Sequence, residues 1–155
     1  MSLIYALFVS PPSTEPLPLS EPLGLDQLAE RSEQVVLGEV TNVWVEPVDG
    51  TPWTVASVLV EESMLGEADR LIEVRWPGGE YGQMELTVSG APDLHAGDRA
   101  VFFVDADSRV VGLSQGVLHV ENTDFLRRDL SGLAYGTEVV SDPEAFTLQQ
   151  VRAAL

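Results

Sequence analysis

The 155-residue chain contains no cysteine. Disulfides, thiolate nucleophiles and cysteine-ligated metals are therefore excluded together. No apolar run approaches the ~20 residues that cross a bilayer, so we expect no membrane insertion. The apolar segment Leu3–Val9 (LIYALFV) is short and has no basic residue before it. It is interpreted as either the remnant of a trimmed signal sequence or a strand.

Lysine is also missing, so all eight basic residues are arginine, against 25 acidic residues and a net charge of −17. A chain this acidic repels phosphate backbones, which excludes nucleic acid as a partner of the whole domain. An anionic membrane surface is disfavoured for the same reason. The simplest interpretation of the charge is a solvated acidic surface.

Proline divides the chain, because five of its ten prolines fall within Ser10–Gly24. Proline fixes φ and removes a backbone donor, so residues 1–23 are expected to form an extended arm. Residues 24–141 would then form one domain, opened by a short helix over Leu25–Arg31. A helix is expected over residues 142–155, with Pro143 at its first position and a capping box over Thr147–Gln150.

Short alternating segments between these helices predict strands. Gly38 interrupts the first of them and indicates a bulge or bend. The fold class expected is mainly β, a small closed antiparallel barrel of the OB type with 5–7 strands, with a small sandwich as the alternative. Residues 122–136 are expected to be irregular. The expected strands cover 34–46, 53–62, 71–76, 84–89, 99–105, 109–113 and 116–121.

The order of landmarks along the chain is specific. It runs RSEQVVLGEV (31–40), VLVEESMLG (58–66), VRWPGGEYG (74–82), VSGAPDLHAGDRAVFFV (88–104) and VVGLSQGVLHV (110–120). This order resembles an OB-like domain of uncharacterised, often exported, bacterial proteins, over about residues 25–121. The resemblance implies a barrel fold and an exported or cell-envelope location, with a cytoplasmic one not excluded. It brings no catalytic residues with it.

The glycine-rich stretch WPGGEYG (76–82) has neither the spacing nor the lysine of a phosphate-binding loop, and Glu80 would repel phosphate. It is predicted to connect two strands, with Trp76 pointing inward. His95 and His119 form no metal-binding pair. The sequence therefore predicts no metal and no cofactor. A Ser/His/Asp arrangement of Ser114, His119 and Asp124 is the enzymatic alternative, a small hydrolase, although no nucleophile elbow accompanies it.

Aromatic side chains are the better functional candidates, because OB barrels bind ligands through such residues on one face. Trp44, Trp53 and Tyr81 are the predicted ligand-binding residues. The function predicted is a non-catalytic binding or interaction module for a sugar, peptide or protein ligand. A dimer formed by strand addition through the N-terminal arm is a further hypothesis.

Overall fold

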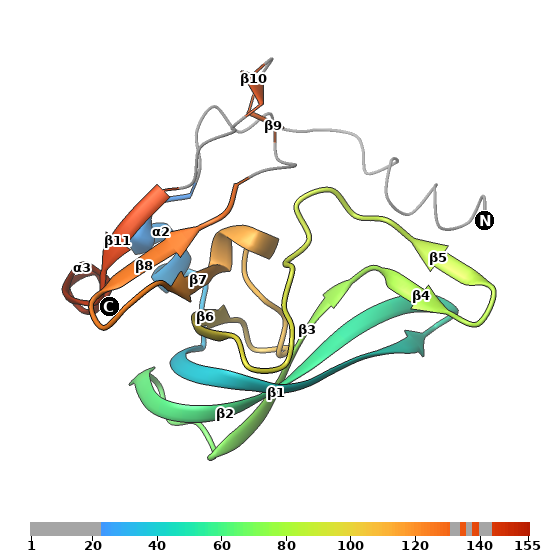
Figure 1. Ribbon diagram of the computed structural model, residues 1–155, viewed down its shortest axis with the longest axis horizontal. Helices are drawn as coiled ribbons and strands as arrows, with labels where there is room; N and C mark the ends of the chain where they lie inside the picture. Colours follow the sequence, from blue (N-terminus) through green and yellow to red (C-terminus); the bar gives the residue numbers. More distant parts are fainter. Residues whose placement is uncertain (1–22, 131–133, 136–137, 140–143) are drawn as a thin grey trace.

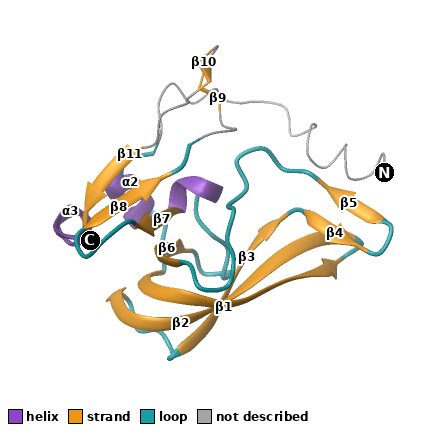
Figure 2. Cartoon of the chain, in the orientation of Figure 1, coloured by secondary structure: helices purple, strands orange, loops and turns teal. Residues whose placement is uncertain are grey.

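The computed structural model describes residues 23–130, 134–135, 138–139 and 144–155. The protein is mainly β with a helix toward each end, as predicted (Figures 1 and 2). Seven strands form one sheet in the order β11-β8-β7-β6-β1-β2-β3, and two small hairpins stand beside it. The proline-rich arm, and with it the hypothesis of a dimer through that arm, lies outside the described residues, as does Pro143.

The elements are bounded as follows: α2 Leu25–Glu30, β1 Gln34–Val48, β2 Thr51–Leu65, β3 Leu71–Pro77, β4 Gly79–Tyr81, β5 Met84–Leu86, β6 Arg99–Val104, the 3-10 turn η1 Leu113–Gly116, β7 Val117–Val120, β8 Phe125–Arg128, β9 Ala134–Tyr135, β10 Glu138–Val139, β11 Glu144–Thr147 and α3 Leu148–Ala154.

Strand β1 organises the sheet, because it pairs with β2 along its length and with β6 through residues 34–39. The pairing with β2 shifts register between Leu37 and Gly38, which confirms the bulge predicted from the isolated glycine. A Cβ atom at Gly38 would lie 2.6 Å from both the Leu59 carbonyl oxygen and Val58 Cγ1. The bend therefore depends on a residue without a side chain.

Two hydrophobic cores lie on opposite faces of β6. Phe102 belongs to the core inside the curved sheet, together with Trp76 and Val117. Phe103 belongs to the second core, which α2 and α3 cover. Both phenylalanines are fully buried, so the continuous apolar run over residues 100–104 reflects a strand covered on both faces.

The WPGGEYG stretch is more than the connection predicted. Trp76 is 4% exposed and belongs to the inner core, as expected of an inward-pointing ring. Gly79 opens the separate strand β4, which pairs with β5. At Gly79 φ is +123°, and an added Cβ would lie 2.9 Å from Val45 Cγ2, so the hairpin packs closely on the β1–β2 ladder.

The second half of the chain differs from the prediction in several places. Residues 109–113, expected to form a strand, have only isolated bridges at Arg109 and Val110 and enter the 3-10 turn η1 at Leu113. Residues 134–135, expected to be irregular, form β9. Residues 125–128, expected to be irregular, form β8, and residues 144–147, expected to be helical, form β11 beside it. The helix begins at Leu148, with Thr147 as the cap and Gln150 completing the predicted capping box. The cap motif therefore located the start of the helix correctly, whereas the helical pattern before it did not.

Helix α3 is held to β2 by Arg152, which donates to the carboxylate of Glu62, with Nη2 to Oε1 at 3.0 Å. This hydrogen bond lowers the pKa of Glu62 below its ordinary value. A carboxyl whose pKa is lowered by folding stabilises the protein above its unfolded-state pKa and loses that contribution as the pH falls through the folded value. We therefore expect stability to fall on acidification, and to fall less in Glu62→Gln, when urea unfolding is compared at pH 7 and pH 3.5. Equal acid sensitivity of the two proteins would contradict this role.

Candidate functional site

Two of the predicted aromatic residues share the outer face of the sheet. Trp44 lies directly opposite Val55, and Trp53 lies two residues before Val55 on the same strand. Both rings are half-buried and lie toward the β1–β2 turn, where Trp53 is the third residue of β2. The outer face at this point therefore carries large aromatic surface beside a fully buried Val55.

Both tryptophans have polar partners on this face. The indole Nε1 of Trp44 donates to Glu46 Oε1 at 2.9 Å. The guanidinium of Arg109 stands over the Trp53 ring, 5.4 Å from its centre. A cation at this distance from an aromatic face is attracted by the ring quadrupole, which favours this position of the guanidinium.

The third predicted residue, Tyr81, is on another element. It ends β4 on the projecting β4–β5 hairpin and is 46% exposed. The three aromatics therefore do not form one cluster in the strand ladder: Trp44 and Trp53 share a face, and Tyr81 stands apart. Their role in binding a ligand stays a prediction.

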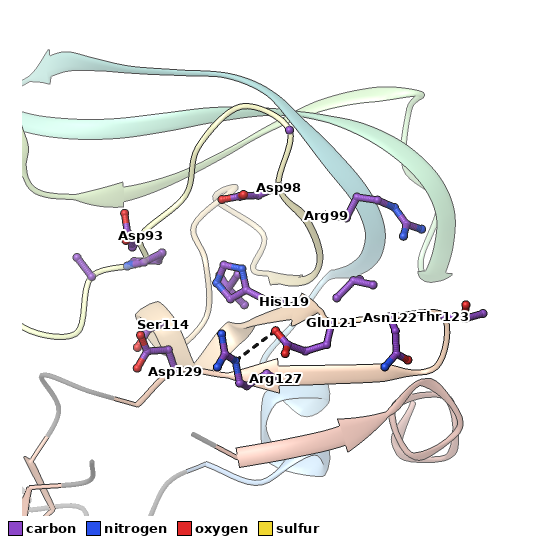
Figure 3. Close-up of a pocket in the computed structure, with 15 residues that line it drawn as sticks. Asp93, Asp98, Arg99, Ser114, His119, Glu121, Asn122, Thr123, Arg127 and Asp129 are labelled. Atoms are coloured by element: carbon purple, nitrogen blue, oxygen red, sulfur yellow. Dashed lines mark ion pairs between the residues drawn. The ribbon is translucent and has the colours of Figure 1, made fainter. Parts of the chain in front are cut away.

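A groove of about 880 Å³ opens elsewhere, between the 91–99 loop and strands β7 and β8 (Figure 3). His119 of β7 lies among the lining residues. Its backbone pairs with Ala100 of β6 on one side and with Arg127 of β8 on the other. The Ser114 backbone N–H donates to the Gly90 carbonyl at 2.9 Å, which joins η1 to the chain just before the loop. The lining residues are Ala91, Pro92, Asp93, Gly97, Asp98, Arg99, Ser114, Val117, His119, Val120, Glu121, Asn122, Thr123, Arg127 and Asp129.

Carboxylates dominate the charge of this groove. Its four acidic residues are Asp93, Asp98, Glu121 and Asp129. Its two arginines already have carboxylate partners: Arg99 binds Glu61 through two hydrogen bonds of 2.7 and 2.9 Å, and Arg127 Nε lies 3.4 Å from Glu121. The Arg99 contact lowers the pKa of the Glu61 carboxyl.

The residues of the hydrolase alternative are only partly brought together. Ser114 and His119 both line the groove, whereas Asp124 lies in the β7–β8 turn outside it. Ser114 Oγ is buried without a hydrogen-bond partner, and the His119 ring makes no hydrogen bond or ion pair with the described residues. The nucleophile–base–acid chain of contacts that defines a triad is not formed among these three side chains.

Comparisons with protein-family models, curated proteins and solved structures find no match to this chain. Function must therefore be argued from the geometry of the surface. Among the described residues, no cluster of three or more histidine, aspartate and glutamate side chains is placed to hold a metal ion. None of the described helices is long and apolar enough to span a membrane.

Sequence reasoning missed the groove. The sequence did not mark the groove carboxylates as special, because acidic residues occur throughout the chain. These carboxylates include Asp93, Asp98 and Glu121. The sequence carries no clear signal for β8, because Phe125–Arg128 has two apolar residues followed by two arginines instead of an alternating pattern. Only the structure shows that Leu126 and Arg128 are buried and that Arg127 pairs with His119.

Proposed function

We propose that the protein is a non-catalytic binding module that holds a positively charged segment of a peptide or protein partner in the groove around His119. The observation that carries this proposal is the presence of four carboxylates in one concave site whose two arginines already have carboxylate partners. Arg99 takes its partner Glu61 from outside the groove, and Arg127 is paired with Glu121. A cationic side chain entering the groove would contact Asp93 and Asp98 without displacing either arginine.

The charge of the whole chain supports the same class of partner. A net charge of −17 attracts cations over long distances and raises the rate at which basic partners arrive. A sugar is less compatible with this groove, because none of its lining residues is a tryptophan, tyrosine or phenylalanine on which a sugar ring could stack. Binding is favoured over hydrolysis because Asp124 lies outside the groove and no residue of the described part of the chain hydrogen-bonds the His119 ring to orient it.

We propose further that the curved sheet closes as an OB-like barrel through residues 108–111. Support comes from two sides of this segment. Arg75 N–H donates to the Ser108 carbonyl at 2.9 Å, and Val110 N–H donates to the Arg75 carbonyl at 3.0 Å. On the other side, Val111 N–H donates to the Phe103 carbonyl at 2.9 Å. These bonds connect β3 with β6, which are separate in the ladder of the main sheet.

The binding proposal is tested by comparing two double variants that have the same net charge but lose carboxylates from different places. The double variant Asp93→Asn with Glu121→Gln removes two groove carboxylates. The matched control, Glu80→Gln with Glu85→Gln, removes two carboxylates from the β4–β5 hairpin. We expect the groove variant to weaken binding of a short peptide of alternating arginine and serine about fivefold, and the control less than about twofold, by isothermal titration calorimetry.

Equal losses in the two variants would mean that only the overall field attracts the peptide, and would contradict a site in the groove. Affinity should also fall as sodium chloride is raised. Equal affinity for a matched peptide of glutamate and serine would contradict the selection of a cationic partner.

A further inference from the structure

Two arginines lie side by side on the outer face of the sheet, away from the groove. Arg75 of β3 and Arg109 are direct partners in a parallel bridge, which two backbone hydrogen bonds hold. Arg75 is also opposite Val55, which is opposite Trp44. Trp44, Val55, Arg75 and Arg109 therefore form one row across the outer face.

Neither arginine makes a close ion pair in the described part of the chain, and Glu46 on the same face accepts from Trp44 instead. Arg75 Nη2 is 3.9 Å from Glu73 Oε1, a distant ion pair, and its Nε is buried with no hydrogen-bond partner among the residues that the structure describes. The Arg109 guanidinium makes no hydrogen bond or ion pair within the described part of the chain. Like charges directly opposite each other in a sheet are destabilising. The chain has 25 acidic residues, yet none of those described forms a close ion pair with Arg75 or Arg109.

The guanidinium of Arg109 nevertheless has a preferred place, because it lies over the Trp53 ring, 5.4 Å from its centre. Stacking leaves the N–H donors at the edge of the guanidinium plane unused, and these donors match the two oxygens of a carboxylate. A group that is held in place before binding loses less side-chain entropy when the ligand arrives.

We propose that Arg75 and Arg109 bind a carboxylate of a peptide, and that Trp44 and Trp53 contact an apolar side chain beside that carboxylate. This second site goes beyond the groove and takes a ligand of opposite charge. The two half-buried tryptophans favour a ligand with an apolar part over a free inorganic anion. Tryptophan and arginine together are the residues most enriched at the energetic centres of protein interfaces, which favours a peptide.

The indole N–H signals of the three tryptophans give a direct test by ¹⁵N–¹H NMR. The probe is a short capped peptide of alternating glutamate and leucine, compared with the same peptide carrying glutamine for glutamate. We expect the glutamate peptide to shift the signals of Trp44 and Trp53 and to leave that of Trp76, which is 4% exposed in the inner core, unchanged. Arg109→Gln and Arg75→Gln should each weaken binding about tenfold.

Arg70→Gln is the matched control, because Arg70 is an exposed arginine in the β2–β3 connection. The affinity of this variant for the glutamate peptide should stay within about twofold of the parent protein. Equal binding of the glutamine peptide, or unchanged affinity in Arg109→Gln, would overturn the proposal. Tighter binding of an oligogalacturonate at the same indoles would assign the site to an acidic sugar and overturn the peptide. The groove variant Asp93→Asn with Glu121→Gln should bind the glutamate peptide as the parent does, so the two proposals fail separately.

Discussion

Replacing Arg128 with methionine is expected to lower the free energy of unfolding by about 3 kcal/mol. Arg128 is 1% exposed, and its Nη1 donates to the Leu23 carbonyl at 2.7 Å and to the Gln115 carbonyl at 3.4 Å. Its guanidinium also lies 5.2 Å from the centre of the Phe146 ring. Methionine would fill part of the volume but leave buried carbonyl oxygens without this donor. Urea unfolding followed by circular dichroism measures the effect.

The neighbouring residue supplies the control. Arg127 is exposed and pairs only with Glu121 in the contacts that the described residues show, so Arg127→Met should cost less than about 1 kcal/mol. Similar losses in the two variants would contradict the assignment of Arg128 as the buried residue that fixes the chain at Leu23.

Replacing Gly38 with alanine is expected to destabilise the protein by about 3 kcal/mol. The new methyl carbon would lie 2.6 Å from the Leu59 carbonyl oxygen, a backbone atom of the paired strand that cannot turn aside. Relief requires β1 and β2 to separate at the bulge, in the strand that organises the sheet. Thermal and urea unfolding should both report the loss.

Gly82→Asn is the corresponding control. Gly82 has φ of +62°, which asparagine tolerates better than most residues, and no heavy atom lies within 4 Å of an added Cβ. This substitution should cost less than about 1 kcal/mol. If Gly38→Ala were as mild, the close approach at the bulge would not be a constraint on the fold.

Much of the strand pattern could be predicted because it depends on local alternation and on turn residues. Asp49 and Gly50 both adopt positive φ at the β1–β2 turn, the conformation that an Asp-Gly pair favours between two strands. Gly38 indicated its bulge, and the Thr147–Gln150 box indicated the start of a helix. In each case residues close in sequence determine the outcome.

What could not be predicted depends on partners distant in sequence. Arg127 and Arg128 are identical in type and adjacent, yet one is exposed and the other is buried against Leu23, 105 positions earlier. The groove could not be predicted from the sequence, because its carboxylates come from segments that only the tertiary fold brings together.

The sharing of β6 by two cores has a thermodynamic consequence. Phe102 and Phe103 are neighbours in the chain but bury their side chains in different clusters. Loss of the strand would expose apolar surface on both sides at once, so neither cluster can be given up alone at low cost. The inner sheet and the helix-covered layer thus behave as one cooperative unit, and a ligand that stabilises the outer face also protects the helices from local opening.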